Sequence, residues 1–345
     1  MSQFNDDLSR LFKVKYLSVA KTDDPFLPGR YDYYLKDVNS NLNEIIDFDN
    51  EHYHEIVSGD GGELEPYIRN NVQLPPKMSC TYSSSALAYN CFSFIRCDKS
   101  FRFSGDLLNS LPDDTYNRAE FEFQIRPLKG TNPANLDVAL IGSKSIIFIE
   151  SKCLETFARA NFEFGESYTK THRYGNDAFA EKWKNLIFCT AYQAPDIHTY
   201  DIAQMLKHLL AISRNRDETN FFGHTNSKYK FKPVDLKGKQ LILLNLVWDF
   251  VPESNIDMHG NSIIDNVTTL DRIQSIQSES SNVAKKWVET LNRFLVDDLG
   301  ILQTEIKVVY EKYSNFIKNS NMREISNKDY EYFMNRYYTP PHKKE

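Results

Sequence analysis

The sequence is poor in features that would place it outside the cell or in a membrane. Its five cysteines are odd in number, scattered and without a CxxC pair: Cys80, Cys91, Cys97, Cys153 and Cys189. This pattern argues against a disulfide framework and against a zinc ribbon. The first residues lack the apolar run of a signal peptide, and no segment reaches the roughly 18 apolar residues that span a bilayer. We therefore expect a cytoplasmic protein that does not enter a membrane.

The chain also lacks an excess of positive charge and several well-known catalytic motifs. Its net charge is −6 and its pI about 5.8, so no global electrostatic attraction draws it to nucleic acid. A protein can keep its basic groups local to one surface, however, so the acidic balance does not exclude a nucleic-acid ligand. No glycine-rich phosphate loop, GxSxG elbow or HExxH motif occurs. Nucleotide-hydrolysing motors, serine hydrolases and zincins therefore have no support.

The length of 345 residues accommodates one large domain or two modest ones, and no internal repeat is present. Residues 1–79 are polar and irregular and rich in turn signals, and we interpret them as an N-terminal accessory segment with a short helix between Asp37 and Tyr53. We expect the core in residues 80–250. Residues 251–345 would form a C-terminal α/β elaboration packed on that core.

Hydrophobic patterning in the central part predicts a helix and then a strand. Ser83 is suited to cap a mostly apolar helix. Residues 120–126 alternate, with Phe121, Phe123 and Ile125 on one face and polar side chains on the other, which is typical of a half-buried strand.

The remaining patterns predict further strands and helices. Short loops join the first three strands, which favours an antiparallel meander. A helical region interrupted near Pro195 follows, and then a buried strand, a helix and a last strand. The predicted ranges are 136–142, 145–152, 177–214, 239–250, 281–299 and 305–310. This order indicates an α/β fold with a mixed central sheet flanked by helices.

Three polar side chains stand at the ends of two of these strands. The apolar run 146–149 stops at Glu150-Ser151-Lys152, and strand alternation places Glu150 and Lys152 on the same face. Asp137 interrupts the apolar run of the preceding strand. Counting outward from the turn at Gly142 brings Asp137 close to the level of Glu150. Two carboxylates and one amine should therefore converge at one edge of the sheet.

This combination suits phosphodiester hydrolysis. Two neighbouring carboxylates repel each other unless a cation lies between them, and hard oxygen ligands that leave room for water suit Mg²⁺. We expect Asp137 and Glu150 to bind Mg²⁺, for which Mn²⁺ could substitute, and the metal to activate water and polarise the phosphate. Burial beside the metal would disfavour the cationic form of Lys152, which could then orient or deprotonate the attacking water.

The arrangement resembles the PD-(D/E)XK nuclease superfamily, and more narrowly its restriction-endonuclease-like members. Their shared core of helix, three-strand meander, helix and strand would cover about residues 83–248. The resemblance implies metal ligation by Asp137 and Glu150 and a water-activating role for Lys152. The proline of the family motif is absent before Asp137, as it is in many members.

The resemblance also implies supporting residues. Some members add an acid from the first helix or strand, a place that Glu122 or Glu120 could fill. Some carry a glutamine on the helix after the third strand, where Gln204 stands here. The tyrosine usual four residues later is His208 in this chain, which leaves the role of Gln204 open. Lys207 and His208 share this helix, and they could face the phosphate or could be structural.

Glu-x-Lys alone is a weak pattern, and 235–237 and 305–307 carry similar triplets. Only Glu150 combines a strand aspartate upstream, a short turn and a buried lead-in. The alternative without a catalytic role is that Glu150 and Lys152 are solvated charges at a strand end. The sequence thus favours a Mg²⁺-dependent endonuclease acting on DNA, such as a prokaryotic restriction or defence nuclease, in which a homodimer would supply two sites for two strands. A catalytically inactive nuclease fold that serves as a nucleic-acid-binding or assembly subunit is the alternative.

Overall fold

A computed structural model describes most of the chain. The described residues are 3–22, 24–47, 49, 51–58, 61–95, 100–128, 130–157, 164–170, 173–174, 177–193, 200–221, 233–257 and 259–338. The expected helix interruption near Pro195 lies outside these ranges. Among the described helices, none combines the length and the apolar character needed to cross a membrane.

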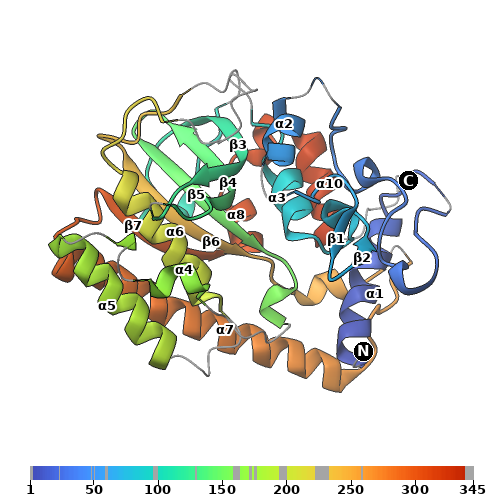
Figure 1. Ribbon diagram of the computed structural model, residues 1–345. Coiled ribbons are helices and arrows are strands. Elements are labelled where there is room, and N and C mark those ends of the chain that lie inside the picture. The colour runs from blue at the N-terminus through green and yellow to red at the C-terminus, as the bar shows by residue number, and fades with distance from the viewer. Residues whose placement is uncertain are drawn as a thin grey trace.

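A mixed five-stranded sheet forms the centre of the molecule, in the order β3-β4-β5-β6-β7 (Figure 1). The strands β3, β4 and β5 are antiparallel, whereas β6 and β7 continue the sheet in parallel with β5. Their bounds are β3 Tyr116–Ile125, β4 Ala134–Gly142, β5 Ser145–Lys152, β6 Gln240–Val247 and β7 Ile306–Lys312. The predicted mixed sheet and its antiparallel first part are confirmed.

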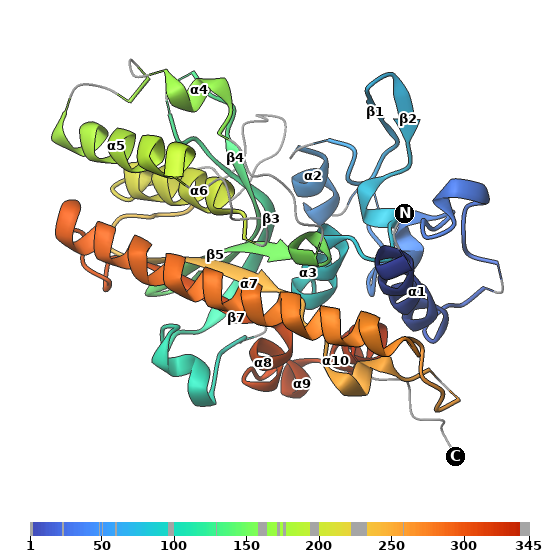
Figure 2. The same cartoon turned by 90° about the horizontal axis from the view of Figure 1, so that it is seen from below.

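Helices cover both faces of this sheet (Figures 1 and 2). One face packs against α3 (Ser84–Phe92), α8 (Tyr313–Lys318) and α10 (Asn327–Tyr337). The other packs against α5 (Ala178–Gln193) and α6 (Ile202–Asn215). The long helix α7 (Val267–Arg293) contributes side chains to both cores. The sheet flanked by helices is therefore as expected.

The strand β5 shows why its sequence is continuously apolar. Ile147 and Ile149 enter the core with α3, while Ile146 and Phe148 enter the core with α6, and all four are fully buried. A strand buried on both faces has no solvated side on which polar residues could alternate.

The N-terminal segment is more regular than the sequence analysis expected. The helix α1 (Gln3–Leu17) was missed, and the helix expected within residues 37–53 lies later, as α2 (Glu51–Ser58). A hairpin of β1 (Tyr67–Arg69) and β2 (Val72–Leu74) was also missed. The short helices α4 (Glu166–Thr169) and α9 (Met322–Ile325) complete the described α-helices, and short 3-10 segments, one of them at Val38–Asn41, lie between the elements.

The expected alternation of β3 is wrong at its centre. Phe121 packs in the core with α3, whereas Phe123 and Ile125 pack in the core with α6. The reason is that Glu122 between them adopts a left-handed backbone with φ of 51°, which breaks the pleat. Glu122 is itself buried, so the strand is not half-solvated.

The turn between β4 and β5 is fixed by a carboxylate from outside the hairpin. Asp114 accepts hydrogen bonds from the backbone amides of Lys144 and Ser145, both at 2.8 Å, and from the hydroxyl of Ser143. A Cβ at Gly142 would lie 2.4 Å from the Asp114 carboxylate, so the turn requires glycine there. This turn sets the register that places the site residues.

Candidate active site

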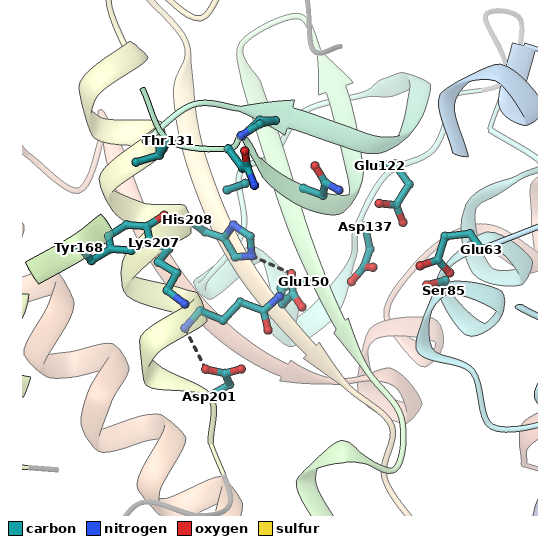
Figure 3. A pocket seen from close by; sticks show the side chains of 15 residues that line it. Glu63, Ser85, Glu122, Thr131, Asp137, Glu150, Tyr168, Asp201, Lys207 and His208 are labelled. Carbon is teal, nitrogen blue, oxygen red and sulfur yellow. Dashed lines mark hydrogen bonds and ion pairs between the residues drawn. The ribbon is translucent and has the colours of Figure 1, made fainter. Parts of the chain in front are cut away.

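The pairing of β4 with β5 brings Asp137 beside Glu150. The last residue pair of this ladder is Val138 with Ile149, and Asp137 and Glu150 are the next residues outward. Beyond the last pair, the amide of Ser151 donates to the side chain of Asp137 and not to a backbone carbonyl, with 2.6 Å between its nitrogen and Oδ2. The two carboxylates thus lie at one rim of the sheet, as the count from the turn predicted (Figure 3).

Both oxygens of the Glu150 carboxylate have partners. Lys152 Nζ donates to Oε1 at 2.6 Å, and His208 Nε2 lies 2.9 Å from Oε2. Lys152 is therefore on the same face as Glu150, as predicted. Glu150 is only 4% exposed, which rules out the alternative of a solvated strand end. Burial raises the pKa of Glu150, but Lys152 and His208 lower it more, to about 2.

The two other members of the set have pKa values shifted upward. Burial, and then the charge of Glu150, raise the pKa of Asp137 well above its usual range. Burial lowers the pKa of Lys152, but the carboxylates of Glu150, Glu155 and Asp137 together raise it above its ordinary value. These carboxylates thus favour the cationic form of Lys152, whereas a divalent ion bound to Asp137 and Glu150 would oppose their effect.

Helix α6 supplies the residues behind Lys152 and Glu150. Gln204 Oε1 accepts a hydrogen bond from Lys152 Nζ at 2.7 Å, and one turn later His208 contacts Glu150. The helix begins at the level of the site because Asp201 caps it, accepting from the amide of Gln204 at 2.9 Å. The spacing of four residues lets one face of α6 hold both members of the Glu-x-Lys pair.

A cavity of about 500 Å³ opens beside Glu150, Gln204 and His208 (Figure 3). Five carboxylates line it: those of Glu63, Glu122, Asp137 and Glu150, and that of Asp201 at the start of α6. Glu120, the other candidate on β3, does not belong to this lining, and its carboxylate pairs with Arg118. The structure thus brings Glu122 to the cavity with the predicted pair.

Cationic and polar groups stand across the cavity from these acids. Lys207 lines it from α6, with its ammonium 5.7 Å from the ring centre of Phe164 and 5.4 Å from that of Tyr168. Burial lowers the pKa of Lys207. Gln204 and His208 line the same wall.

Glu63 was not found from the sequence. It lies 74 residues before Asp137 in the segment ahead of the β1–β2 hairpin, and it is 5% exposed. Its Oε1 accepts from Lys77 Nζ at 2.9 Å, whereas its Oε2 is buried without a hydrogen-bond partner among the described residues. Its charge contributes to the raised pKa of Asp137. No local pattern marks it, because its position depends on how the N-terminal segment folds over the sheet.

The donor set suits a hard cation that keeps part of its water. Within the described ranges, no three His, Cys, Asp or Glu side chains already lie close enough together to hold a metal ion. The carboxylates nevertheless line one cavity, Asp137 is destabilised as an anion by its neighbour, and Glu63 Oε2 lacks a donor. Magnesium is commonly held by one or two carboxylates, with water and phosphate completing its shell, so the residues fit such an ion.

The mixed sheet with a carboxylate-lined cavity at its rim is consistent with an α/β protein of nuclease-like fold. A family model described as Restriction Endonuclease associating with ARP matches residues 35–226, more than half of the chain, and the chain belongs to this family. This membership indicates a nuclease or defence role. No curated protein and no solved structure matches the chain.

Proposed function

We propose that this protein is a Mg²⁺-dependent endonuclease of the PD-(D/E)XK type that hydrolyses phosphodiester bonds in DNA. The observation that carries the proposal is that Asp137 and Glu150 converge at one sheet rim and line a carboxylate-rich cavity, with the Lys152 ammonium 2.6 Å from Glu150 Oε1. Solvated charges would not need this burial, and a structural ion pair would not need a second carboxylate against it. Membership of the restriction-endonuclease family described above supports the same function.

Asp137 and Glu150 would hold the ion, with Glu122 or Glu63 as a further ligand. The bound ion would act as a Lewis acid on the phosphate and lower the pKa of a coordinated water. Lys152, which lies against Glu150, would orient or deprotonate the attacking water, or donate a hydrogen bond to a phosphate oxygen. Lys207, across the cavity, would attract the phosphate.

Two residues of α6 would act by positioning these groups. Gln204 accepts from the Lys152 ammonium and so fixes its direction. His208 contacts Glu150 Oε2, the oxygen that Lys152 does not bind. It stands at the position of the tyrosine usual in related enzymes. Together they restrict the rotamers of the Glu-x-Lys pair.

The test is cleavage of supercoiled plasmid and of linear single- and double-stranded DNA with Mg²⁺, Mn²⁺ or EDTA. We expect nicked or linear product only with a divalent ion, and a loss of about 100-fold or more in Lys152→Ala and in Asp137→Asn. Lys144→Ala is the matched control, since Lys144 is exposed at the opposite end of the same hairpin. Equal cleavage by wild type and Lys152→Ala, or undiminished cleavage in EDTA, would refute the proposal.

An inactive nuclease fold that serves as a binding or assembly subunit is the second candidate. The engagement of both Glu150 oxygens by Lys152 and His208 favours it, because two protein partners already balance the charge of this carboxylate. Wild type and Lys152→Ala that bind DNA equally and cleave none of the substrates would establish this candidate. Sedimentation of the wild-type protein with and without DNA would show whether two copies pair, as a double-strand cut would require.

A further inference from the structure

A second cavity, of about 310 Å³, adjoins the first. It lies between the start of α3, the segment that follows β5 and the N-terminal segment. Its lining is Tyr34, Lys77, Cys80, Tyr82, Ser83, Ser84, Ser85, Leu154 and Glu155. The proposed hydrolytic chemistry uses none of these side chains.

The two cavities share a wall. Ser85, in the first turn of α3, lines both of them. Lys77 of the second cavity forms an ion pair with Glu63 of the first, with 2.9 Å between Nζ and Oε1. A molecule in the second cavity would therefore be a neighbour of one in the carboxylate site, and both could belong to the same nucleic-acid strand.

The second cavity has an aromatic wall that its surroundings hold in place. The Tyr82 ring stacks on Tyr33 with 5.3 Å between centroids and an angle of 25°, and Tyr34 lies against Tyr33 at 5.0 Å. The backbone is fixed as well, because Tyr34 pairs with Cys80 and the amide of Thr81 donates to the carbonyl of Tyr33 at 3.1 Å. The Tyr34 ring is tilted by 40° against Tyr33, so Tyr82, which is held by its stack on Tyr33, is the ring suited to stacking on a ligand.

Polar groups surround this aromatic wall. Hydroxyl groups come from Ser83, Ser84 and Ser85, an ammonium from Lys77 and a carboxylate from Glu155. Glu155 is fixed by the amide of Cys153, which donates to its Oε2 at 2.6 Å. Flat apolar rings beside mixed donors and acceptors match a heteroaromatic ring with polar edges. The volume is at the lower end of the range for ligand clefts, about 300–1,000 Å³, and so suits a nucleobase but not a duplex.

We propose that this second cavity binds one unpaired nucleobase of the strand whose phosphate enters the carboxylate site. The neighbouring phosphate rests on the proposed nuclease function, whereas the base site rests on the cavity itself. The enzyme would then favour single-stranded DNA, or a duplex in which one base leaves the stack. Tyr82 would stack on the base, Tyr34 would lie against it at an angle, and the serine hydroxyls and Glu155 would meet its edge.

The probe is a short single-stranded DNA oligonucleotide with one 2-aminopurine, whose fluorescence is quenched on stacking, measured with the full chain in EDTA. We expect saturable quenching by wild type and by Tyr82→Phe, which keeps the ring. Tyr82→Leu should weaken binding about tenfold. The same base paired within a duplex should be quenched far less. Ser84→Phe, which fills the cavity without removing a ring, serves as a second variant if Tyr82→Leu does not fold.

The outcomes separate this proposal from the nuclease proposal. Quenching that is unchanged in both Tyr82→Leu and Ser84→Phe overturns the base site, whatever the cleavage assay shows. Quenching that depends on Tyr82 in a protein that cleaves no DNA overturns the nuclease and supports the base site.

Discussion

At the scale of single residues, the site shows how buried charges are held close together. An isolated carboxylate in the interior would lose its hydration and become protonated. Glu150 keeps its charge because an ammonium and an imidazole each contact one of its oxygens. Burial raises the pKa of Asp137 and the charge of Glu150 raises it further, while the backbone amide of Ser151 opposes this shift only in part. A divalent cation bound to both carboxylates would offset the repulsion between Asp137 and Glu150.

A second buried acid, away from the cavity, gives a pH-dependent prediction. Burial raises the pKa of Glu55 on α2 to about 8, although the amide of Phe121 donates to its Oε2 at 2.7 Å and opposes the shift. A raised folded pKa means that the native state binds the proton more tightly than the unfolded chain. Unfolding free energy is therefore greatest below the unfolded value and falls as pH rises toward about 8.

We predict that wild type loses on the order of 3 kcal/mol of unfolding free energy between pH 5 and pH 9 through Glu55. Glu55→Gln, which cannot ionise, should be more stable than wild type at pH 9, and the advantage should shrink at pH 5. Urea denaturation at the two pH values measures this. Glu51→Gln, at an exposed position on the same helix, should change stability by less than about 0.5 kcal/mol. Equal pH dependence in wild type and Glu55→Gln would contradict the prediction.

The residues that the sequence could reveal are those whose neighbours along the chain define their place. Asp137 and Glu150 flank one short turn, so strand periodicity and a count were enough to bring them together. Glu63 comes from a distant segment, and the charge state of Lys152 depends on Glu155 and Asp137 around it. Both are products of tertiary packing, which periodicity does not contain.

At the scale of elements, the predictions fail where the hydrophobic pattern is mixed with polar residues or where no local pattern marks the feature. Helix α1 carries buried Phe4, Leu8, Leu11 and Phe12 at helical spacing, so its pattern was present among polar neighbours. The break at Glu122 has no such signature, because nothing in an alternating run reveals a left-handed residue. It lies opposite Asp137 in the register, and strained backbone of this kind concentrates at functional sites.

The Asp114 contact with the β4–β5 turn gives a prediction about an element. Its carboxylate satisfies two backbone amides and the hydroxyls of Ser143 and Ser145. Burial raises the pKa of Asp114, but these hydrogen bonds lower it more, so its stabilisation is present at neutral pH and is lost as pH falls through the lowered value.

We predict that Asp114→Ala destabilises the protein by about 2–3 kcal/mol at pH 7, because buried donors lose their acceptor. The deficit relative to wild type should shrink at acid pH. Asp113→Ala, at the exposed neighbouring position, is the control. Thermal unfolding at pH 7 and at pH 2 gives both values, and similar melting temperatures for the two variants at pH 7 would show that the turn does not depend on Asp114.

At the scale of the whole molecule, distant parts of the chain combine to build the cavity. The sheet provides Asp137 and Glu150, α6 provides Gln204 and His208, and the N-terminal segment provides Glu63. The sequence predicted the sheet and its flanking helices because each depends on local periodicity. It could not predict which segments meet over the rim, since no pattern specifies a contact between residues 63 and 137.

One buried cation on α10 links several of these parts. Arg336 is fully buried and donates to the carbonyl of Phe12 on α1, to Asn41 Oδ1 and to the carbonyl of Thr81 just before α3. Its guanidinium also lies 5.3 Å from the ring centre of Tyr16. Thus one side chain near the C-terminus contacts three separate segments of the first 81 residues.

We predict that Arg336→Met lowers the free energy of unfolding by about 3 kcal/mol or more, because the replacement is apolar and leaves buried acceptors without donors. Tryptophan fluorescence in urea measures it, and Trp248 reports directly because its ring contacts Phe12 at 4.7 Å. Arg323→Met, on the exposed side of α9, should cost less than about 0.5 kcal/mol. Because α1 and Glu63 belong to the same N-terminal segment, Arg336→Met should also weaken any DNA cleavage at temperatures just below its melting point, where Arg323→Met stays active. Comparable stability of the two arginine variants would mean that the segments hold together without this link.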